Sequence, residues 1–321
     1  MVPDIHAVAA RPVVSVVVPA YNEADVLPEF HRRLASVLDA VDGACEMIYV
    51  DDGSTDSSLG VMHDIASRDA RAVVVALSRN FGKEAAMTAG LEHASGEAVI
   101  VIDADLQDPP EEIPAMLAQW REGADMVLMQ RSSRAGESWF KQWTARRFYR
   151  VMDRLGEIDV PGDVGDFRLL SRRAVDAVRQ LRERTRFMKG LYSWVGFRQV
   201  ILRYERDARH AGETKWNYWR LWNFAIEGIT SFSTAPLKIA SYAGFAVAFG
   251  AFLFGAKVLL KTMFFGDPVQ GFTTLVTVVL FLGGVQLMAL GVIGEYLGRV
   301  FVEVKRRPLY IIESVRRGPG D

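Results

Sequence analysis

The C-terminal third of the chain contains two long apolar stretches that restrict what it can fold into. They cover about residues 235–265 and about residues 272–301. About 20 apolar residues suffice to cross the hydrocarbon core of a bilayer. Between the two stretches lies only a short turn, residues 266–271, which contains no lysine or arginine. The pattern predicts a hairpin of two membrane-spanning helices over residues 235–303. The alternative is a helical hairpin buried inside a large soluble protein.

Both outer flanks of the predicted hairpin are basic. Because lysine and arginine concentrate on the cytoplasmic side of a membrane, we expect both termini, including the tail of residues 304–321, to be cytoplasmic and the short turn to be outside. Lys257 and Lys261, near the outer end of the first helix, are expected to extend toward the interface. The basic residues are Arg203, Arg206, Arg209, Lys215, Arg220 and Lys238 before the hairpin, and Arg299, Lys305, Arg306, Arg307, Arg316 and Arg317 after it.

Residues 13–215 show a different pattern, in which short β-branched runs alternate with amphipathic helical segments. Such alternation is typical of an α/β fold with βαβ units around a mostly parallel sheet, in which ligands bind at the carboxyl ends of the strands. Residues 1–12 are expected to be a disordered lead-in. The predicted strands are residues 13–18, where Pro19 ends the strand, 45–50, 72–77, 99–102 and 125–129, and the predicted helices are residues 24–41, 57–67, 83–94 and 114–121.

The composition excludes some classes of function. The formal net charge of −1 gives no reason to expect a nucleic-acid partner. The chain has one cysteine, Cys45, so an intramolecular disulfide is excluded and a reducing compartment is favoured. We expect Cys45 to be a buried structural thiol.

The predicted strand at residues 99–102 ends abruptly in two carboxylates, Asp103 and Asp105. Side chains two apart on extended backbone point the same way, so both can face one point beyond the end of the strand. Mg²⁺ prefers a few carboxylates together with the phosphate oxygens of a ligand. The pattern therefore fits a metal site. The alternative is an acidic turn in which Asp108 caps a helix that starts at Pro109 and Pro110.

Polar residues also follow the first two predicted strands. Carboxylates accept hydrogen bonds from ribose hydroxyls or a base N–H, and a tyrosine ring can stack on a base, so a nucleotide fits these strand ends. The alternative for the second strand end is a tight turn built on Gly53 and Ser54. The glycine pattern of a dinucleotide-binding site is missing, and Lys83 does not follow a P-loop, which argues against both classes. The candidate nucleotide-binding residues are Pro19, Tyr21, Glu23, Asp51, Asp52, Lys83 and Asp103.

Two segments mix aromatic residues with cations, at residues 139–155 and residues 216–232. This mixture is typical of helices that lie in the headgroup layer of a membrane. We expect residues 216–234 to form such an interfacial helix, with packing against the sheet as the alternative for both segments.

Seven motifs together resemble a known family. The GT-A fold of family 2 glycosyltransferases is similar at residues 16–23 (VVVPAYNE), 51–56 (DDGSTD), 78–84 (SRNFGKE) and 103–111 (DADLQDPPE). The polyprenyl-phosphate glycosyltransferases of the dolichol-phosphate mannose synthase and bactoprenol glucosyltransferase type are similar also at residues 165–169 (GDFRL), 209–215 (RHAGETK) and 294–299 (GEYLGR). This resemblance spans nearly the whole chain after residue 12.

The resemblance implies roles for individual residues. Asp103, Asp105 and Gln107 would hold Mg²⁺ or Mn²⁺, and Asp105, Asp166 and Arg131 would be the catalytic residues. Asp166 would act as a base, or its ordinary role would be an ion pair with Arg168. Arg131 together with Arg146 or Arg147 would face the lipid phosphate, while Arg209 and Lys215 would lie on a loop that closes over the diphosphate.

The resemblance also implies an activity and a location. The enzyme would transfer a sugar, with glucose from UDP-glucose favoured, to undecaprenyl or another polyprenyl phosphate, inverting the anomeric carbon. It would be a multi-pass protein of the bacterial cytoplasmic membrane and a homo-oligomer, such as a tetramer. In that assembly, residues 307–312 would form an exposed strand that pairs with a neighbouring subunit. Two alternatives are a processive polysaccharide synthase, whose Gln-x-x-Arg-Trp motif is missing here, and a non-catalytic membrane scaffold.

Overall fold

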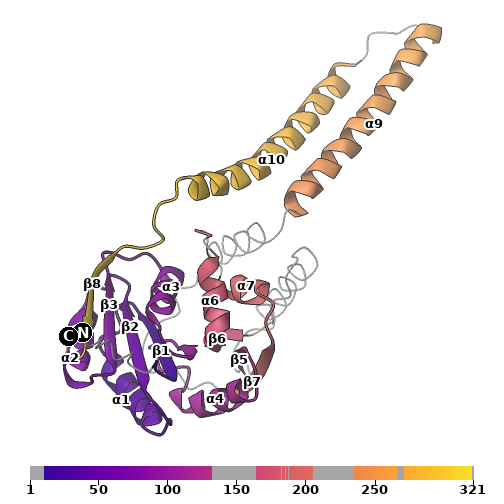
Figure 1. Ribbon diagram of the computed structural model, residues 1–321. Helices are drawn as coiled ribbons and strands as arrows, with labels where there is room; N and C mark the ends of the chain where they lie inside the picture. The colour runs from indigo at the N-terminus through magenta and orange to yellow at the C-terminus, as the bar shows by residue number, and fades with distance from the viewer. Residues whose placement is uncertain are drawn as a thin grey trace, which may run out of the picture. The chain divides into compact units, whose positions relative to one another are not determined.

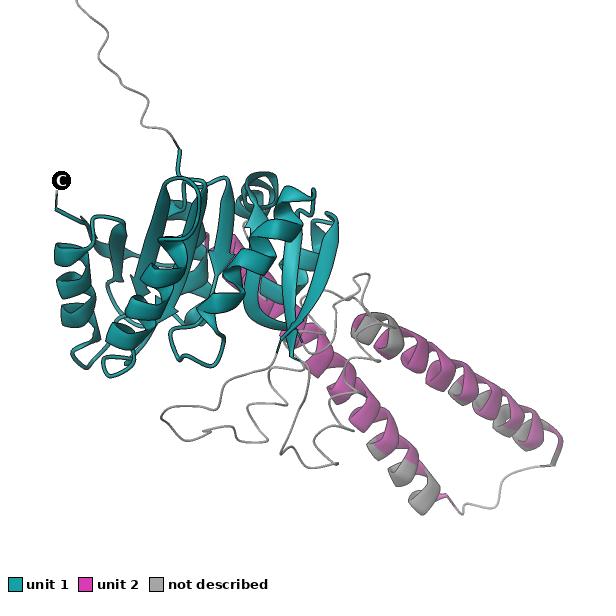
Figure 2. Ribbon diagram, turned by 90° about the horizontal axis from the view of Figure 1, so that it is seen from below, with its two compact units in different colours: residues 1–149, 158–217, 308–321 teal, residues 150–157, 218–307 magenta. Residues whose placement is uncertain are grey.

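The computed structural model describes residues 11–131, 164–204 without 182, 185 and 187, 235–265, and 271–319. The chain divides into two compact units, drawn in different colours in Figure 2. The first contains the sheet and the C-terminal tail, and the second contains two long helices. The predicted helices at residues 139–155 and 216–232, and residues 1–10 of the predicted lead-in, lie outside the described residues.

The first unit is built on an eight-stranded sheet of order β7-β5-β6-β4-β1-β2-β3-β8. Within it, β6 and β8 run antiparallel to their neighbours and the other strands are parallel, which confirms the predicted α/β fold with a mostly parallel sheet. The central strands are buried on both faces, as their continuous apolar runs require. The strands are β1 (Val14–Ala20), β2 (Cys45–Asp51), β3 (Ala72–Leu77), β4 (Ala98–Val101), β5 (Met126–Arg131), β6 (Val164–Ser171), β7 (Gln199–Tyr204) and β8 (Ile312–Arg317).

Helices cover both faces of this sheet (Figure 1). On one face, Phe30 and Leu34 of α1 pack into a core that includes Val16 of β1. On the other face, α3 lies very close to β1, because a Cβ added at Gly90 would meet Val17 at 2.1 Å. The helices of this unit are α1 (Leu27–Leu38), α2 (Ser58–Arg68), α3 (Lys83–His93), the 3-10 turn η1 (Pro110–Glu112), α4 (Ile113–Arg121), α6 (Arg172–Gln180) and α7 (Met188–Trp194).

The ends of the first and fourth strands are among the bounds that differ from the sequence-based expectation. The first strand continues through Pro19 to Ala20, because the ladder at this end uses the Ala20 carbonyl, which accepts a hydrogen bond from Asp52 N at 3.0 Å, and needs no N–H from proline. The fourth strand ends at Val101, and the chain then turns, with Leu106 at φ 57°. Asp103 and Asp105 therefore lie in a loop, so the extended backbone expected there is not formed, and the expectation that both side chains face one point stays a prediction.

The C-terminal tail adds the last strand to the sheet. Strand β8 pairs antiparallel with β3 of the same chain, and just before it Ser78 N donates to the carbonyl of Ile311 at 2.9 Å. The Tyr310 hydroxyl hydrogen-bonds to Glu92 on α3. The tail strand begins at Ile312, so it overlaps the expected strand at residues 307–312 only at its last residue, and the pairing of that segment with a neighbouring subunit stays a prediction.

The second unit contains α9 (Ala235–Phe265) and α10 (Phe272–Val304), which lie side by side in both ribbon views. Among the described residues, one stretch, Phe281–Val304, is long and apolar enough to cross a membrane, and it is not buried. The shorter apolar stretch of α9 is Ala240–Phe254. The exposed apolar side chains do not fit a hairpin buried in a soluble core. A second span in α9 stays a prediction.

Candidate functional site

The sheet reverses its strand order at β1, which has β2 on one side and β4 on the other. In open parallel sheets, such a switch point leaves a crevice at the carboxyl ends of the strands, where ligands bind. The residues that follow these three strands are the polar ones singled out from the sequence, namely Tyr21, Asn22 and Glu23 after β1, Asp51 and Asp52 at the end of β2, and Asp103 after β4.

The loops after β1 and β2 are joined by hydrogen bonds. Asn22 N donates to Ser54 Oγ at 3.0 Å, and its side-chain oxygen accepts from Thr55 N at 2.8 Å. Glu23 N donates to Ser58 Oγ at 2.8 Å. Tyr21 is held at the start of this loop with its side chain 44% exposed. The wall beside β1 is thus fixed by its backbone, while the Tyr21 ring remains accessible.

Asp51 and Asp52 are buried and accept hydrogen bonds from backbone amides. Asp51 accepts from Ser54 N at 3.2 Å. Asp52 accepts from Phe81 N at 2.8 Å and from Gly82 N at 3.0 Å, and burial raises its pKa. The tight turn proposed for this segment is present: Gly53 has φ +64°, and a Cβ there would meet the Arg79 backbone at 2.3 Å. The expected contact of Asp51 and Asp52 with a nucleotide stays a prediction.

Lys83, Asp103 and Asp166 form one charged cluster. The Lys83 ammonium, at the start of α3, donates to Asp103 at 2.7 Å and to Asp166 at 2.5 Å. Against the lowering effect of burial, the two carboxylates raise the pKa of Lys83. Although burial opposes it, the nearby cations, Lys83 first, hold the pKa of Asp166 well below its usual range. Burial raises the pKa of Asp103 more than Lys83 lowers it.

The Asp103–Asp166 pair suits a hard cation. Two carboxylates from different segments already converge on one positive group, and Mg²⁺ is commonly held by one or two carboxylates together with ligand phosphates. Asp105 is half-buried and accepts a hydrogen bond from Gln107 N at 3.1 Å, and the Gln107 side chain is buried. Across the described ranges, no group of three His, Cys, Asp or Glu side chains is placed to hold a metal. The donor set therefore fits a cation that also binds a ligand.

A second polar cluster was not foreseen from the sequence. Asp108 is buried and accepts a hydrogen bond from the Tyr204 hydroxyl, and Tyr204 also hydrogen-bonds to Arg131. The predicted capping role of Asp108 was wrong, because Pro109 precedes η1 and no side-chain cap bond is formed there. Gly165 lies close to Arg131, with its added Cβ 3.6 Å from the guanidinium, so Arg131 stands next to the strand that carries Asp166. The acidic loop is held by a tyrosine almost a hundred residues away, which no local pattern reveals.

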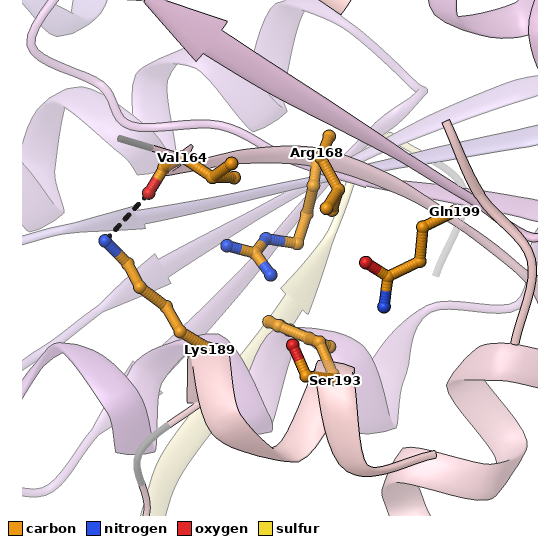
Figure 3. Close-up of a pocket in the computed structure, with 7 residues that line it drawn as sticks. Val164, Arg168, Lys189, Ser193 and Gln199 are labelled. Atoms are coloured by element: carbon orange, nitrogen blue, oxygen red, sulfur yellow. Dashed lines mark hydrogen bonds between the residues drawn. The ribbon is translucent and has the colours of Figure 1, made fainter. Parts of the chain in front are cut away.

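Arg168 does not form the predicted ion pair with Asp166. Its guanidinium is buried and donates to the backbone carbonyl of Gly165 at 2.6 Å, and it lies 4.2 Å from the Tyr192 ring centroid. Lys189 donates to the carbonyl of Val164 at 3.0 Å. Figure 3 shows Arg168 between Lys189 and Gln199 in a small pocket beside β6. The backbone carbonyls, rather than the Asp166 carboxylate, satisfy this guanidinium.

One further titratable group lies beside the charged cluster. Glu84, next to Lys83 on α3, accepts from Met188 N at 3.3 Å, and burial raises its pKa to about 7.

Cys45 is only half-buried, so the expectation of a buried thiol was wrong in degree. The expected lipid-phosphate and loop residues Arg146, Arg147, Arg209 and Lys215 lie outside the described residues.

Comparison with known proteins gives matches over nearly the whole chain. Residues 15–179 match the family model described as Glycosyl transferase family 2. An uncharacterized glycosyltransferase of Synechocystis sp. is 51% identical over 94% of this chain and 95% of its own length. The SfII prophage-derived bactoprenol glucosyl transferase of Shigella flexneri is 46% identical over 95% of this chain and 99% of its own length.

Among solved structures, glucosyl-3-phosphoglycerate synthase from Mycobacterium tuberculosis has a low overall similarity. It has a TM-score of 0.47 and is 22% identical, covering 69% of this chain and 78% of that one.

Proposed function

The chain belongs to glycosyl transferase family 2, and on that premise we propose that it transfers a sugar from a nucleotide-sugar to polyprenyl phosphate at a membrane surface. The carboxylates of Asp103 and Asp166, which converge at the carboxyl edge of the sheet, are the observation that carries the chemistry. The relatives named bactoprenol glucosyl transferase favour a polyprenyl phosphate acceptor and glucose as the sugar. The apolar helix Phe281–Val304 supports a membrane location.

On the donor side, we propose that the nucleoside lies against the β1 and β2 ends. The exposed Tyr21 ring is available to stack on a base, and Glu23 and Pro19 belong to the same wall. Asp51 and Asp52, which are already hydrogen-bonded to amides, would offer their remaining acceptor positions to the nucleoside. UDP-glucose is the favoured donor.

On the metal side, Asp103 would hold Mg²⁺ or Mn²⁺, with Asp105 and Gln107 on the same loop. When bound, the cation would stabilise the negative charge of the departing nucleoside diphosphate. Lys83 stands beside the same oxygens and supplies a further positive charge toward that diphosphate.

On the acceptor side, a phosphate monoester is already anionic at neutral pH, since its second pKa is about 6. Positioning by cations is then more important than proton removal, and Arg131, which lies beside β6, would take that role. Asp166 is a weak base with its lowered pKa, which fits an orienting role better than strong general-base catalysis.

The test is a nucleoside diphosphate release assay on the purified full chain, with UDP- and GDP-sugars, with and without undecaprenyl phosphate. We expect release that depends on lipid, on divalent cation and on UDP-glucose. Release accompanied by the formation of a polysaccharide would indicate a processive synthase. The absence of lipid-dependent release with every donor would overturn the proposal in favour of a non-catalytic scaffold.

A further inference from the structure

The Lys83 ammonium bridges two of the carboxylates that would hold a metal ion in this site. It lies within hydrogen-bond distance of both Asp103 and Asp166. The Lys83 side chain is 43% exposed, whereas those of Asp103 and Asp166 are 23% and 20% exposed. Over its whole length, the Lys83 side chain is therefore more exposed than either carboxylate that its ammonium joins.

The backbone before Lys83 is held by hydrogen bonds, whereas the Lys83 side chain is held only through its terminal ammonium. The amides of Phe81 and Gly82 donate to Asp52, which holds the start of α3. Lysine has a flexible four-carbon stem and a compact ammonium. The ammonium can thus leave the carboxylates without any movement of the helix.

The charges of the cluster set up a competition. Two carboxylates and one ammonium leave a single negative charge, and Arg168 and Lys189 add positive potential at Asp166. A divalent cation that enters this cluster meets the same oxygens that Lys83 holds, and it is repelled by the ammonium at short range. The anionic diphosphate of a nucleotide would remove that repulsion.

We infer that Lys83 is a built-in competitor of the divalent cation, which holds Asp103 and Asp166 in the nucleotide-free protein and keeps metal affinity low until an anionic nucleotide binds. The inference rests on the proposed function, because it assigns the nucleotide to the same crevice. The inference predicts that loss of Lys83 raises the affinity for metal in the absence of nucleotide. Loss of a lysine whose only role is to bind phosphate would leave that affinity unchanged.

The test is a titration of the full chain in detergent with Mn²⁺ alone, followed by the EPR signal of free Mn²⁺. We expect Lys83→Met to bind Mn²⁺ at least about tenfold more tightly than the wild type, a step of about 1.4 kcal/mol. Lys83→Arg keeps the charge and should stay close to the wild type. Lys189→Met is the matched control, because Lys189 is a neighbouring cation that donates to the Val164 carbonyl instead of bridging the carboxylates. It should tighten binding less.

Unchanged or weaker Mn²⁺ binding by folded Lys83→Met would overturn the inference. If that variant fails to fold, the wild type decides: UDP should tighten Mn²⁺ binding, and the absence of such coupling would refute the inference. The Mn²⁺ titration requires neither lipid nor sugar transfer. If Lys83→Met binds Mn²⁺ more tightly but the wild type shows no sugar transfer, only the proposed function is refuted. If the wild type transfers sugar but Lys83→Met does not bind Mn²⁺ more tightly, only the competition between Lys83 and the cation is refuted.

Discussion

Two pairs of carboxylates lie at the carboxyl edge of the sheet and are held in different ways. Asp51 and Asp52, at the end of β2, are 2% and 3% exposed and accept hydrogen bonds from backbone amides. Asp103 and Asp166, after β4 and on β6, are more exposed and share the ammonium of one lysine side chain.

The difference separates a structural role from one that a ligand can take over. Backbone amides that donate to Asp52 cannot leave without unfolding the loop before α3. The flexible side chain of Lys83 can leave Asp103 without movement of the backbone, and a cation that replaces it offsets the cost of leaving the partly buried carboxylates unpaired. A pair of carboxylates released in this way can bind a cation, whereas a pair satisfied by amides mainly stabilises the wall of the crevice.

The largest effect is expected for Asp103→Ala, which should lower lipid-dependent nucleoside diphosphate release at least about a thousandfold, because metal charge stabilisation is worth several kcal/mol. The thermal unfolding midpoint should change little, since Lys83 retains Asp166 as its partner. A large drop in the midpoint would show that Asp103, like Asp51 and Asp52, mainly stabilises the fold, and would contradict the difference drawn between the two pairs.

Asp166→Asn should reduce turnover less, by about a hundredfold, and leave a measurable rate. The reason is that the acceptor phosphate is already anionic, so that loss of a weak base is tolerated. Steady-state turnover measured beside Asp103→Ala provides the check. If correctly folded Asp166→Asn were as inactive as Asp103→Ala, the account of the nucleophile would be wrong.

Asp52→Ala should lower the stability of the fold, apart from removing the proposed contact with the nucleoside. It leaves the partly buried amides of Phe81 and Gly82 without their acceptor, which costs roughly 1–3 kcal/mol in the free energy of unfolding. Chemical unfolding of the full chain in detergent measures this, and Asp52→Asn, which keeps one oxygen acceptor, is the matched control and should recover part of the loss. An unchanged stability in Asp52→Ala would contradict the structural role.

The smallest effect is a change in the pH dependence of stability at Glu84. Because burial raises the pKa of Glu84 to about 7, well above the ordinary value of a glutamate carboxyl, the folded protein binds more protons than the unfolded chain between these two values. This contribution is present at low pH, and it makes stability fall as pH rises through that window. Glu84→Gln should flatten the slope of the unfolding midpoint between about pH 5 and pH 7. An equal slope in the variant would show that Glu84 is ionised in the folded protein.

Much of the sheet was predictable because the signal is local. The run at residues 72–77 was predicted as a strand and forms β3 with those bounds. Apolar runs between polar turns are typical of buried parallel strands, and the carboxyl-edge rule correctly brought the β1, β2 and β4 ends together. The family was also correctly identified from its motifs.

The partners of the polar residues were not predictable in the same way. Lys83 meets Asp166 across a sequence separation of 83 residues, and Tyr204 meets Asp108 across 96. A local pattern offered Arg168 as the partner of Asp166 and a helix cap as the role of Asp108, and both were wrong. Nearby residues compete with distant ones for each polar group, and the packed fold decides which of them is within reach.

By itself, the sequence determined the order of strands and helices from β1 to β5, the carboxylate-bearing strand ends and the long apolar helices, because periodicity and turn residues act over a few positions. The tertiary structure alone decided that Asp52 is held by amides, that Lys83 joins Asp103 to Asp166, and that the tail strand pairs with β3 of its own chain. Each of these depends on segments far apart in the chain. Only packing around the sheet, which buries apolar surface and requires partners for buried polar groups, brings them to hydrogen-bond distance.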